Sequence, residues 1–215
     1  MKTIALFGST GKAGRVLLKK LLDKGYVVKV LVRNPAKLSF THSQLSVIQG
    51  DVLNMEDVVK AIEKSEVIIN VIGHVKGCPP DLQTRASKNI LSGMQQSGIT
   101  RLINLTGGGV KVESDNPGWI DRMLVFTMKN LLGKSLRNRM VDGDNHVALI
   151  SKSKADWTIV RAPVLLPGKA KGKTRIGNVG HIPGYSLTFE DLTDQIIRIL
   201  EEKSFVRQYP YITNG

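Results

Sequence analysis

A short glycine-rich loop between an apolar segment and an amphipathic segment is the feature that most limits how this chain can fold. The loop reads Gly-Ser-Thr-Gly-Lys-Ala-Gly at residues 8–14. The apolar run at residues 2–7 precedes it, and residues 12–24 follow with leucines at helical spacing. This order predicts a buried strand, a turn and a helix whose free N–H groups face a bound phosphate. The alternative is a tight turn that serves only close packing of the helix against the strand.

Strand-like and helix-like segments alternate along the first half of the chain. We expect strands at residues 2–7, 27–32, 44–49, 66–72 and 101–105, and helices at 12–24, from Asn54 onward, and at 80–97. Asp57, three residues after Asn54, forms a weak capping pair with it. Strands joined by helices predict right-handed crossovers and a parallel sheet, and the valine- and isoleucine-rich strands are typical of a sheet covered on both faces. The sequence therefore predicts an α/β fold, a single Rossmann-like domain with a doubly wound parallel sheet and helices on both faces.

The second half of the chain is less regular. We expect helices at residues 119–132, at about 138–153 and from Thr188 onward, a sixth strand at 157–161 and a terminal strand at 209–213. Residues 163–187 are rich in Gly, Lys and Pro and show no period, which predicts one long functional or mobile loop. We assign a cofactor-binding half to about residues 1–110 and a substrate side to about residues 111–215 of the one domain.

Composition and charge exclude several classes of protein. One cysteine in 215 residues cannot form an internal disulfide, and no apolar run is long enough for a membrane span or a signal-peptide core. We therefore expect a cytoplasmic protein. The formal charge is +13, and residues 122–175 hold 12 Lys or Arg against three Asp. Because aromatic residues make up only 5% of the chain, a stacking surface for nucleic acid has little support, and we do not expect a nucleic-acid partner.

The segments after the second, third and fourth strands carry candidate nucleotide contacts. Arg33 follows the second strand where sites for NAD often place Asp or Glu, and a guanidinium favours a 2′-phosphate. The alternative is an exposed arginine at a strand end. Asp51, after the third strand, either accepts from an adenine amino group or holds a turn. Gly73 would let a nucleotide lie across the sheet. This pattern predicts NADP (NADPH) as the cofactor in preference to NAD.

The chain resembles the atypical short-chain dehydrogenase/reductases of the NAD(P)H-binding, NmrA-like group, and is similar to the branch that contains the flavin and biliverdin-IXβ reductases. The resemblance spans nearly the whole chain and rests on residues 8–14, on V-L-V-R-N-P at 30–35, on G-D-V at 50–52, on D-W-T-I-V-R-A-P at 156–163 and on T-F-E-D-L at 188–192. It implies the cofactor contacts of this chain: Gly8, Ser9, Thr10, Gly11, Lys12, Ala13, Gly14 and Arg33 around the phosphates, Asp51 and Val52 beside the adenine, Ile72 and Gly73 over the ribose, and Thr106 and Pro163 near the nicotinamide.

The residues that carry the chemistry in ordinary short-chain dehydrogenases are missing. No tyrosine is followed four residues later by lysine, so the Tyr-x-x-x-Lys acid is absent. Thr106 is followed by Gly107 where the reductase branch often has Ser, and Pro163 by Val164 where it has His, which argues against biliverdin as the acceptor. Thr106 and His146 are weak catalytic candidates, and the alternative for His146 is a surface residue beside Asp144.

Two further groups of residues each have a functional interpretation and a purely structural alternative. His74 and Cys78 stand four apart, but two ligands are too few for a metal site, and we predict no metal. Residues 107–109 are three glycines that either open space for a planar ring or form a flexible turn.

Two functions fit these observations. The first is an NADPH-dependent oxidoreductase that transfers hydride to a planar acceptor such as a flavin or quinone, bound over residues 106–109 beneath the 163–187 loop. The second is a non-catalytic NADP(H)-binding redox sensor that regulates another protein. We expect a monomer or a homodimer with a small planar acceptor as substrate.

Overall fold

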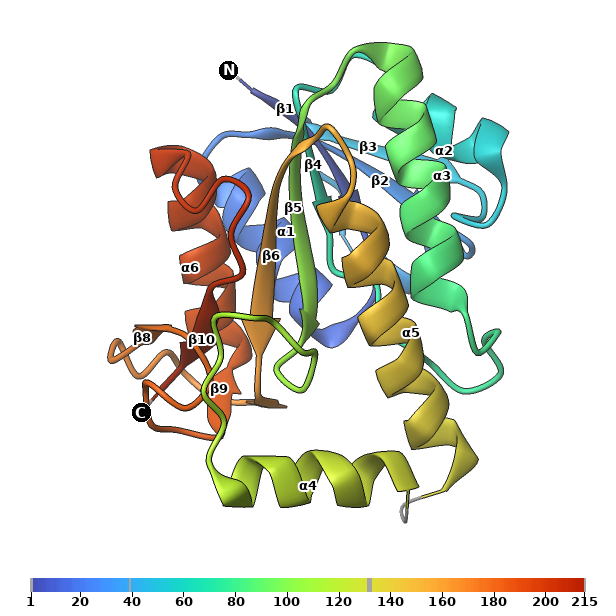
Figure 1. The fold of residues 1–215 in the computed structure, drawn as a ribbon. Coiled ribbons are helices and arrows are strands. Elements are labelled where there is room, and N and C mark those ends of the chain that lie inside the picture. Colours follow the sequence, from blue (N-terminus) through green and yellow to red (C-terminus); the bar gives the residue numbers. More distant parts are fainter. Residues whose placement is uncertain (1, 39, 131–132, 215) are drawn as a thin grey trace.

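The computed structural model describes residues 2–38, 40–130 and 133–214, and the side chains of 124 and 128–130 lie outside the description. An eight-stranded sheet with the order β3-β2-β1-β4-β5-β6-β10-β8 forms the centre of the molecule (Figure 1). All of its neighbouring strands are parallel except β10 and β8. The strands are β1 (Thr3–Phe7), β2 (Val27–Val32), β3 (Leu45–Gln49), β4 (Val67–Asn70), β5 (Arg101–Gly107), β6 (Asp156–Ala162), β8 (Arg175–Gly177) and β10 (Tyr211–Thr213).

Helices cover both faces of the sheet. They are α1 (Lys12–Asp23), α2 (Met55–Ile62), α3 (Leu82–Ser97), α4 (Trp119–Asn130), α5 (Lys134–Ser151) and α6 (Phe189–Glu202), with a short 3₁₀ turn η1 (Pro35–Lys37). One hydrophobic core lies under α1 and α6, and a second lies under α2, α3 and α5. The two layers of helices stand on opposite sides of the sheet in Figure 1, as a doubly wound fold requires. The predicted fold class is confirmed.

The strand order creates a crevice at the carboxyl ends of the central strands. The chain leaves β1 toward β2 and β3 on one side, and later returns to β4 on the other side. Ligands of open α/β sheets bind where the strand order reverses in this way. The loop after β1 and the segments that follow β4 and β5 therefore share one edge of the sheet, above α4 in Figure 1.

The structure agrees with the expected first half and corrects the second. The helix expected at 80–97 begins at Leu82, and the helix expected at about 138–153 begins earlier, at Lys134. The helix expected at 119–132 is α4, and its last two expected residues lie outside the described part of the chain. The long loop predicted at 163–187 is wrong, because this segment contains β7 (Val164–Leu166), β8 and β9 (Ser186–Thr188).

The strands of this segment pair with partners far along the chain. β8 adds to β10 in the main sheet, and β7 pairs with β9 in a separate two-stranded ribbon. Three-residue strands leave almost no periodic signal. Tertiary contacts decide which strands pair, so the sequence pattern predicted a loop for this segment.

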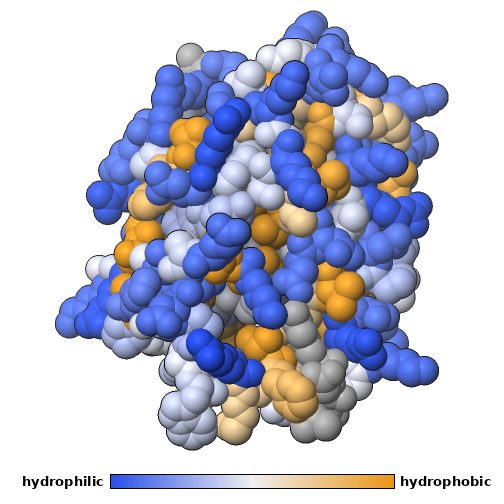
Figure 2. Space-filling model, viewed as in Figure 1, coloured by the Kyte–Doolittle hydropathy of each residue, from blue (hydrophilic) through white to orange (hydrophobic). Residues whose placement is uncertain are grey.

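The α4 helix exposes hydrophobic side chains on its outer side. Trp119, Ile120, Met123 and Phe126 are all exposed. Figure 2 shows a mostly hydrophilic face with hydrophobic groups scattered over it, some of them at its lower end, where Figure 1 places α4. Among the described residues, no helix combines the length and the apolar character needed to cross a bilayer.

Candidate functional site

The glycine loop after β1 is shaped by close backbone contacts. Gly8 has a φ of +87°, and a Cβ there would lie 2.8 Å from the backbone carbonyl carbon of Val71. A Cβ on Gly14 would lie 2.0 Å from the carbonyl oxygen of Gly8. Packing of the chain itself therefore requires glycine at both positions, before any ligand is considered. Gly11 is exposed, and a Cβ there would lie 3.2 Å from the same oxygen.

The start of α1 leaves its first N–H groups available. Its N-terminal cap is Gly11, which supplies no side-chain hydrogen bond, and no acidic residue stands in its first turn. By contrast, Asn54 caps α2 and Thr188 caps α6 with side-chain oxygens, and both helices have acidic first turns. Ser9 Oγ in the loop is fully buried and has no hydrogen-bond partner among the described residues. Because it is buried, this hydroxyl does not face a ligand, and the uncapped helix start is the part of the loop that is suited to bind an anion.

Arginine side chains organise the segment after β2. The Arg15 guanidinium donates from Nε to the Thr10 carbonyl over 3.0 Å and from an Nη to the Lys37 carbonyl over 3.2 Å. Arg15 therefore joins the glycine loop to the η1 turn, a role that the sequence reading missed because nothing in its spacing marks it. Arg33 is exposed at the end of β2, and Asn34 caps η1 by accepting from the Ala36 N–H.

Asp51 holds the turn that follows β3. Its Oδ1 accepts from the Leu53 N–H over 2.9 Å, and its own N–H donates to Asp57 Oδ2 over 2.9 Å. This is the turn-holding alternative for Asp51. The predicted capping pair is half right. Asn54 Oδ1 accepts from the N–H groups of Glu56 and Asp57, but the Asp57 carboxylate accepts from the Asp51 N–H instead of the Asn54 N–H. Val52 is half-buried, and its carbonyl accepts from the Asn89 side chain.

A chain of buried polar groups runs from β4 through β5 to α5. Asn70 donates to Asn104 over 2.7 Å, Asn104 lies 3.1 Å from His146 Nε2, and His146 Nδ1 lies 3.1 Å from the Asp142 carbonyl. Since a carbonyl only accepts, Nδ1 of His146 carries the proton and Nε2 accepts from Asn104. At the other end, Asn70 accepts from the Ile72 N–H.

His146 is therefore not the surface residue beside Asp144 that the sequence allowed. It is 0% exposed, and burial lowers its pKa, so the ring stays neutral. With both ring nitrogens engaged inside the fold, it cannot reach a substrate as the proton donor that we considered. Thr106 is also buried, on the side of β5 that faces Gly143 of α5.

The three glycines after β5 differ in what surrounds them. A Cβ on Gly107 would meet no atom within 4 Å, whereas one on Gly108 would lie 2.6 Å from the ring of Tyr211. The planar group over Gly108 is therefore a side chain of this protein, and open space remains at Gly107. The Tyr211 hydroxyl donates to the Gly184 carbonyl, and burial raises the pKa of Tyr211 to about 12, so the phenol stays protonated.

A cavity of about 390 Å³ lies beside Tyr211. It is lined by residues of two loops and of α4 and β10: Asn116, Gly118, Asp121, Val179, Gly180, His181, Ile182, Pro183, Gly184, Tyr185 and Tyr211. A buried ion pair lies next in the chain to the lining residue Asn116, since Arg161 of β6 binds both carboxylate oxygens of Asp115. Asp115 also accepts from the Val179 N–H over 3.0 Å. This pair joins β6 to the segments before α4 and after β8. Pro163 begins the chain segment that leads to this side.

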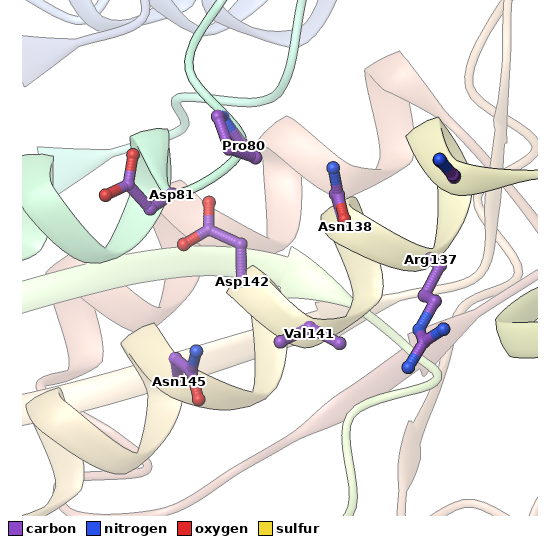
Figure 3. Close-up of a pocket in the computed structure, with 8 residues that line it drawn as sticks. Pro80, Asp81, Arg137, Asn138, Val141, Asp142 and Asn145 are labelled. Atoms are coloured by element: carbon purple, nitrogen blue, oxygen red, sulfur yellow. The ribbon is translucent and has the colours of Figure 1, made fainter.

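A second cavity, of about 490 Å³, lies between the starts of α3 and α5. Figure 3 shows Asp142 of α5 directed toward Pro80 and Asp81 at the start of α3. Asp142 accepts from the N–H groups of Gln83 and Thr84, so it caps α3 from another helix. The sequence reading missed Asp142, whose partners lie about sixty residues away.

The fold and the crevice define a class before any comparison: a Rossmann-type protein with an anion-binding helix start at the crevice of its sheet. The chain belongs to the NAD(P)H-binding family, whose sequence profile it matches over residues 8–203. It is an NAD(P)H-binding protein with a Rossmann-like fold, in agreement with the resemblance to atypical short-chain dehydrogenase/reductases.

Curated relatives are distant. The chain is 26% identical over 106 residues to the uncharacterized protein YwnB of Bacillus subtilis. This match covers 49% of this chain and 47% of that protein. It is 25% identical over 191 residues to the uncharacterized chloroplastic protein At2g34460 of Arabidopsis thaliana. This match covers 83% of this chain and 62% of that protein. The chain thus spans about half to three-fifths of the length of these relatives.

Solved structures share the fold over nearly the whole chain. ChuY, an anaerobilin reductase from Escherichia coli O157:H7, has a TM-score of 0.79 at 18% identity, covering 100% of this chain and 98% of its own. A short-chain dehydrogenase/reductase from Veillonella parvula in complex with NADP has a TM-score of 0.78 at 18% identity, covering 99% and 94%. At these identities the similarity shows the fold alone.

Proposed function

We propose that this chain is an NADPH-dependent oxidoreductase that delivers hydride to a small planar acceptor such as a flavin or quinone. The observation that carries the proposal is the uncapped start of α1 at the crevice of the sheet. A pyrophosphate suits this position, because its oxygens accept from the free N–H groups of the helix start. Family membership supports the same cofactor class.

The proposed contacts follow the strand ends in order. Residues 8–14 hold the phosphates, and Arg33 binds the 2′-phosphate that distinguishes NADP from NAD. Asp51 and Val52 flank the adenine, Ile72 and Gly73 cover the ribose, and Thr106 and Pro163 lie near the nicotinamide. The carboxyl ends of β1 to β6 support this order, since each segment follows one of them.

The cofactor preference has support from charge. Arg15 uses its guanidinium on two backbone carbonyls, whereas Arg33 is exposed at the strand end with no acidic residue at 33 or 34. A ribose 2′-hydroxyl would prefer a carboxylate there, and a 2′-phosphate prefers the guanidinium.

The acceptor site in this proposal is the cavity beside Tyr211, whose ring also lies against Gly108. Bound nicotinamide would supply the hydride. The chain's own part is to orient the acceptor beside Tyr185 and Tyr211, in a segment that the Arg161–Asp115 pair holds through Val179. Flavins and quinones suit a site with no buried acid directed at the acceptor, because water can protonate their reduced forms.

A second candidate is a non-catalytic NADP(H)-binding redox sensor. The observation that favours it is the burial of both catalytic candidates, Thr106 and His146, inside the packing between β5 and α5. A protein that only binds the nucleotide needs no acid at this position.

Paired titrations separate the two functions. Purified protein is titrated with NADPH and with NADH under nicotinamide fluorescence, and FMN or menadione is then added. We expect tighter binding of NADPH, followed by its oxidation when an acceptor is present. Tight binding without oxidation by either acceptor would support the sensor, and failure to bind either nucleotide would overturn both functions.

A further inference from the structure

A cysteine, a histidine and an aspartate from two distant segments meet beside the start of α3. Cys78 Sγ lies 3.5 Å from His74 Nδ1, and His74 Nε2 lies 2.7 Å from Asp142 Oδ2. His74 and Cys78 belong to the segment after β4, and Asp142 belongs to α5. None of the three is among the nucleotide contacts proposed above.

Asp142 is held as a carboxylate. Its side chain is 1% exposed. Burial would raise the pKa of Asp142, but hydrogen bonds from the Thr84 hydroxyl, from the Thr84 and Gln83 N–H groups and from His74 bring the pKa below its ordinary value. A buried carboxylate with four donors is held in one orientation, so it fixes the orientation of the neighbouring imidazole.

The hydrogen bond to Asp142 decides which nitrogen of His74 is free. Because the carboxylate accepts, Nε2 of His74 carries the proton and donates it. Nδ1 then keeps its lone pair, and this lone pair faces the thiol of Cys78. An activated thiol needs a base next to it and a carboxylate that orients the base. Cys78, His74 and Asp142 stand in this arrangement.

The thiol is reachable, and a metal does not explain the cluster. Cys78 is half-buried rather than sealed in the core. Within the described part of the chain, no group of three or more His, Cys, Asp or Glu is placed to hold a metal ion. The 490 Å³ cavity of Figure 3 is lined by Asp142 and by Pro80, two residues from Cys78, so it lies next to the cluster.

We propose that Cys78 is a nucleophilic thiol that adds to α,β-unsaturated carbonyl compounds, with His74 as its base and Asp142 as the residue that positions the base. Sulfur forms a bond to the β-carbon while the carbon–carbon π bond breaks. The thiol proton passes to Nδ1 of His74 and then to the α-carbon, so the thioether forms without an oxidant or a second reactant. No second cysteine exists to form a disulfide within the chain.

The charged groups around the pair set the expected pH dependence. Asp142 faces His74 from α5, Asp81 stands at the start of α3, and Lys76 lies in the same loop as the pair. Lys134 and Arg137 line the cavity from the start of α5. His146 lies close enough for His74 to contribute to its lowered pKa, but it stays neutral.

Labelling with N-ethylmaleimide tests the proposal, because this reagent is an electron-poor alkene and the chain has one cysteine. Intact-mass spectrometry gives the rate of adduct formation from pH 6 to pH 9. We expect wild-type protein at pH 7 to react at least about tenfold faster than the His74→Gln variant. An unassisted thiol is mostly protonated at pH 7 and ionises with a pKa near 8.5, so the two rates should converge near pH 9.

Matched variants separate activation from access. The His181→Gln variant, changed in an exposed loop, should react at the rate of wild type. The rate of the Asp142→Asn variant at pH 7 should fall toward that of His74→Gln. The Cys78→Ser variant should form no adduct. Circular dichroism checks that each variant is folded. Equal rates for wild type and His74→Gln at pH 7, an equal loss at every pH, or no adduct on folded wild type would overturn the proposal. The assay uses no nucleotide, so it stands or fails apart from the proposed reductase.

Discussion

The two sides of the sheet crevice are built in different ways. On the nucleotide side, β1, α1 and β2 are consecutive, and the turn between them is set by glycines within seven residues of one another. On the cavity side, the 111–118 and 163–187 segments are held by buried side chains that join distant positions. Arg161 binds Asp115, and Asp191 accepts from the Lys171 and Gly172 N–H groups. The first side depends on local backbone shape, and the second depends on long-range polar contacts.

This difference teaches where each side is vulnerable. A local turn fails when one added atom meets the backbone, because the backbone has nowhere to move. A long-range polar contact fails when one partner is removed, because the other is left buried and unsatisfied. The predictions below test the two cases, starting with the largest effect.

Gly14→Ala should give the largest loss. The new Cβ would lie 2.0 Å from the Gly8 carbonyl oxygen, so the loop or α1 must shift. We expect the free energy of unfolding to fall by more than about 4 kcal/mol, measured by urea denaturation, with loss of NADPH binding. Gly73→Ala is the matched control, since its Cβ would meet no atom within 4 Å, and it should change stability by less than about 0.5 kcal/mol. Equal effects of the two substitutions would contradict the packing argument.

Asp115→Ala should give the next largest loss. It leaves the fully buried Arg161 guanidinium without its carboxylate, which costs about 3 kcal/mol in urea denaturation. Limited proteolysis should also find new cleavage near residues 178–185, because Val179 loses its acceptor. Arg198→Ala breaks an exposed ion pair with Glu202 and should cost less than about 0.5 kcal/mol. If both variants cost the same, the buried pair does not hold the cavity side.

Arg33→Ala changes ligand choice rather than stability. Loss of a charge-assisted contact of about 1.5–3 kcal/mol should weaken NADPH binding roughly 10- to 100-fold, with NADH changed by no more than about twofold. Fluorescence titration measures both constants, and Arg198→Ala serves again as the control. Equal losses of affinity for the two nucleotides would contradict the assignment of Arg33 as the contact to the 2′-phosphate.

The smallest effect is a pH dependence from His146. Its pKa is lowered in the folded protein from an ordinary value of 6.5, so the unfolded chain binds the proton first as the pH falls. The contribution of the neutral His146 ring to the free energy of unfolding is therefore present in full above pH 6.5. Below that pH the free energy of unfolding falls, by at most about 1.4 kcal/mol per pH unit. Urea denaturation of His146→Gln from pH 7.5 to pH 5 should show a flatter profile than wild type. A wild-type profile that is flat over this range would contradict the assignment of a neutral buried ring.

The local pattern predicted much of the fold. The strand at 27–32 and the glycine loop with its helix were found where the sequence placed them, because apolar runs and glycine turns act over a few residues. The same kind of pattern failed at 163–187, because β8 depends on β10, and β7 and β9 depend on each other across about twenty residues. It also missed Arg15, whose partners are backbone carbonyls that no spacing reveals.

The sequence by itself determined the doubly wound class, the glycine turn and the candidate nucleotide segments, since these follow from periodicity and backbone shape. Only the tertiary structure decided which polar side chains meet. It buried His146 between β5 and α5, filled the space over Gly108 with Tyr211, and brought Asp142 to His74 from 68 residues away. Apolar residues need only the right face of an element, whereas a hydrogen bond needs one partner at one distance. Folding of the whole chain sets that distance.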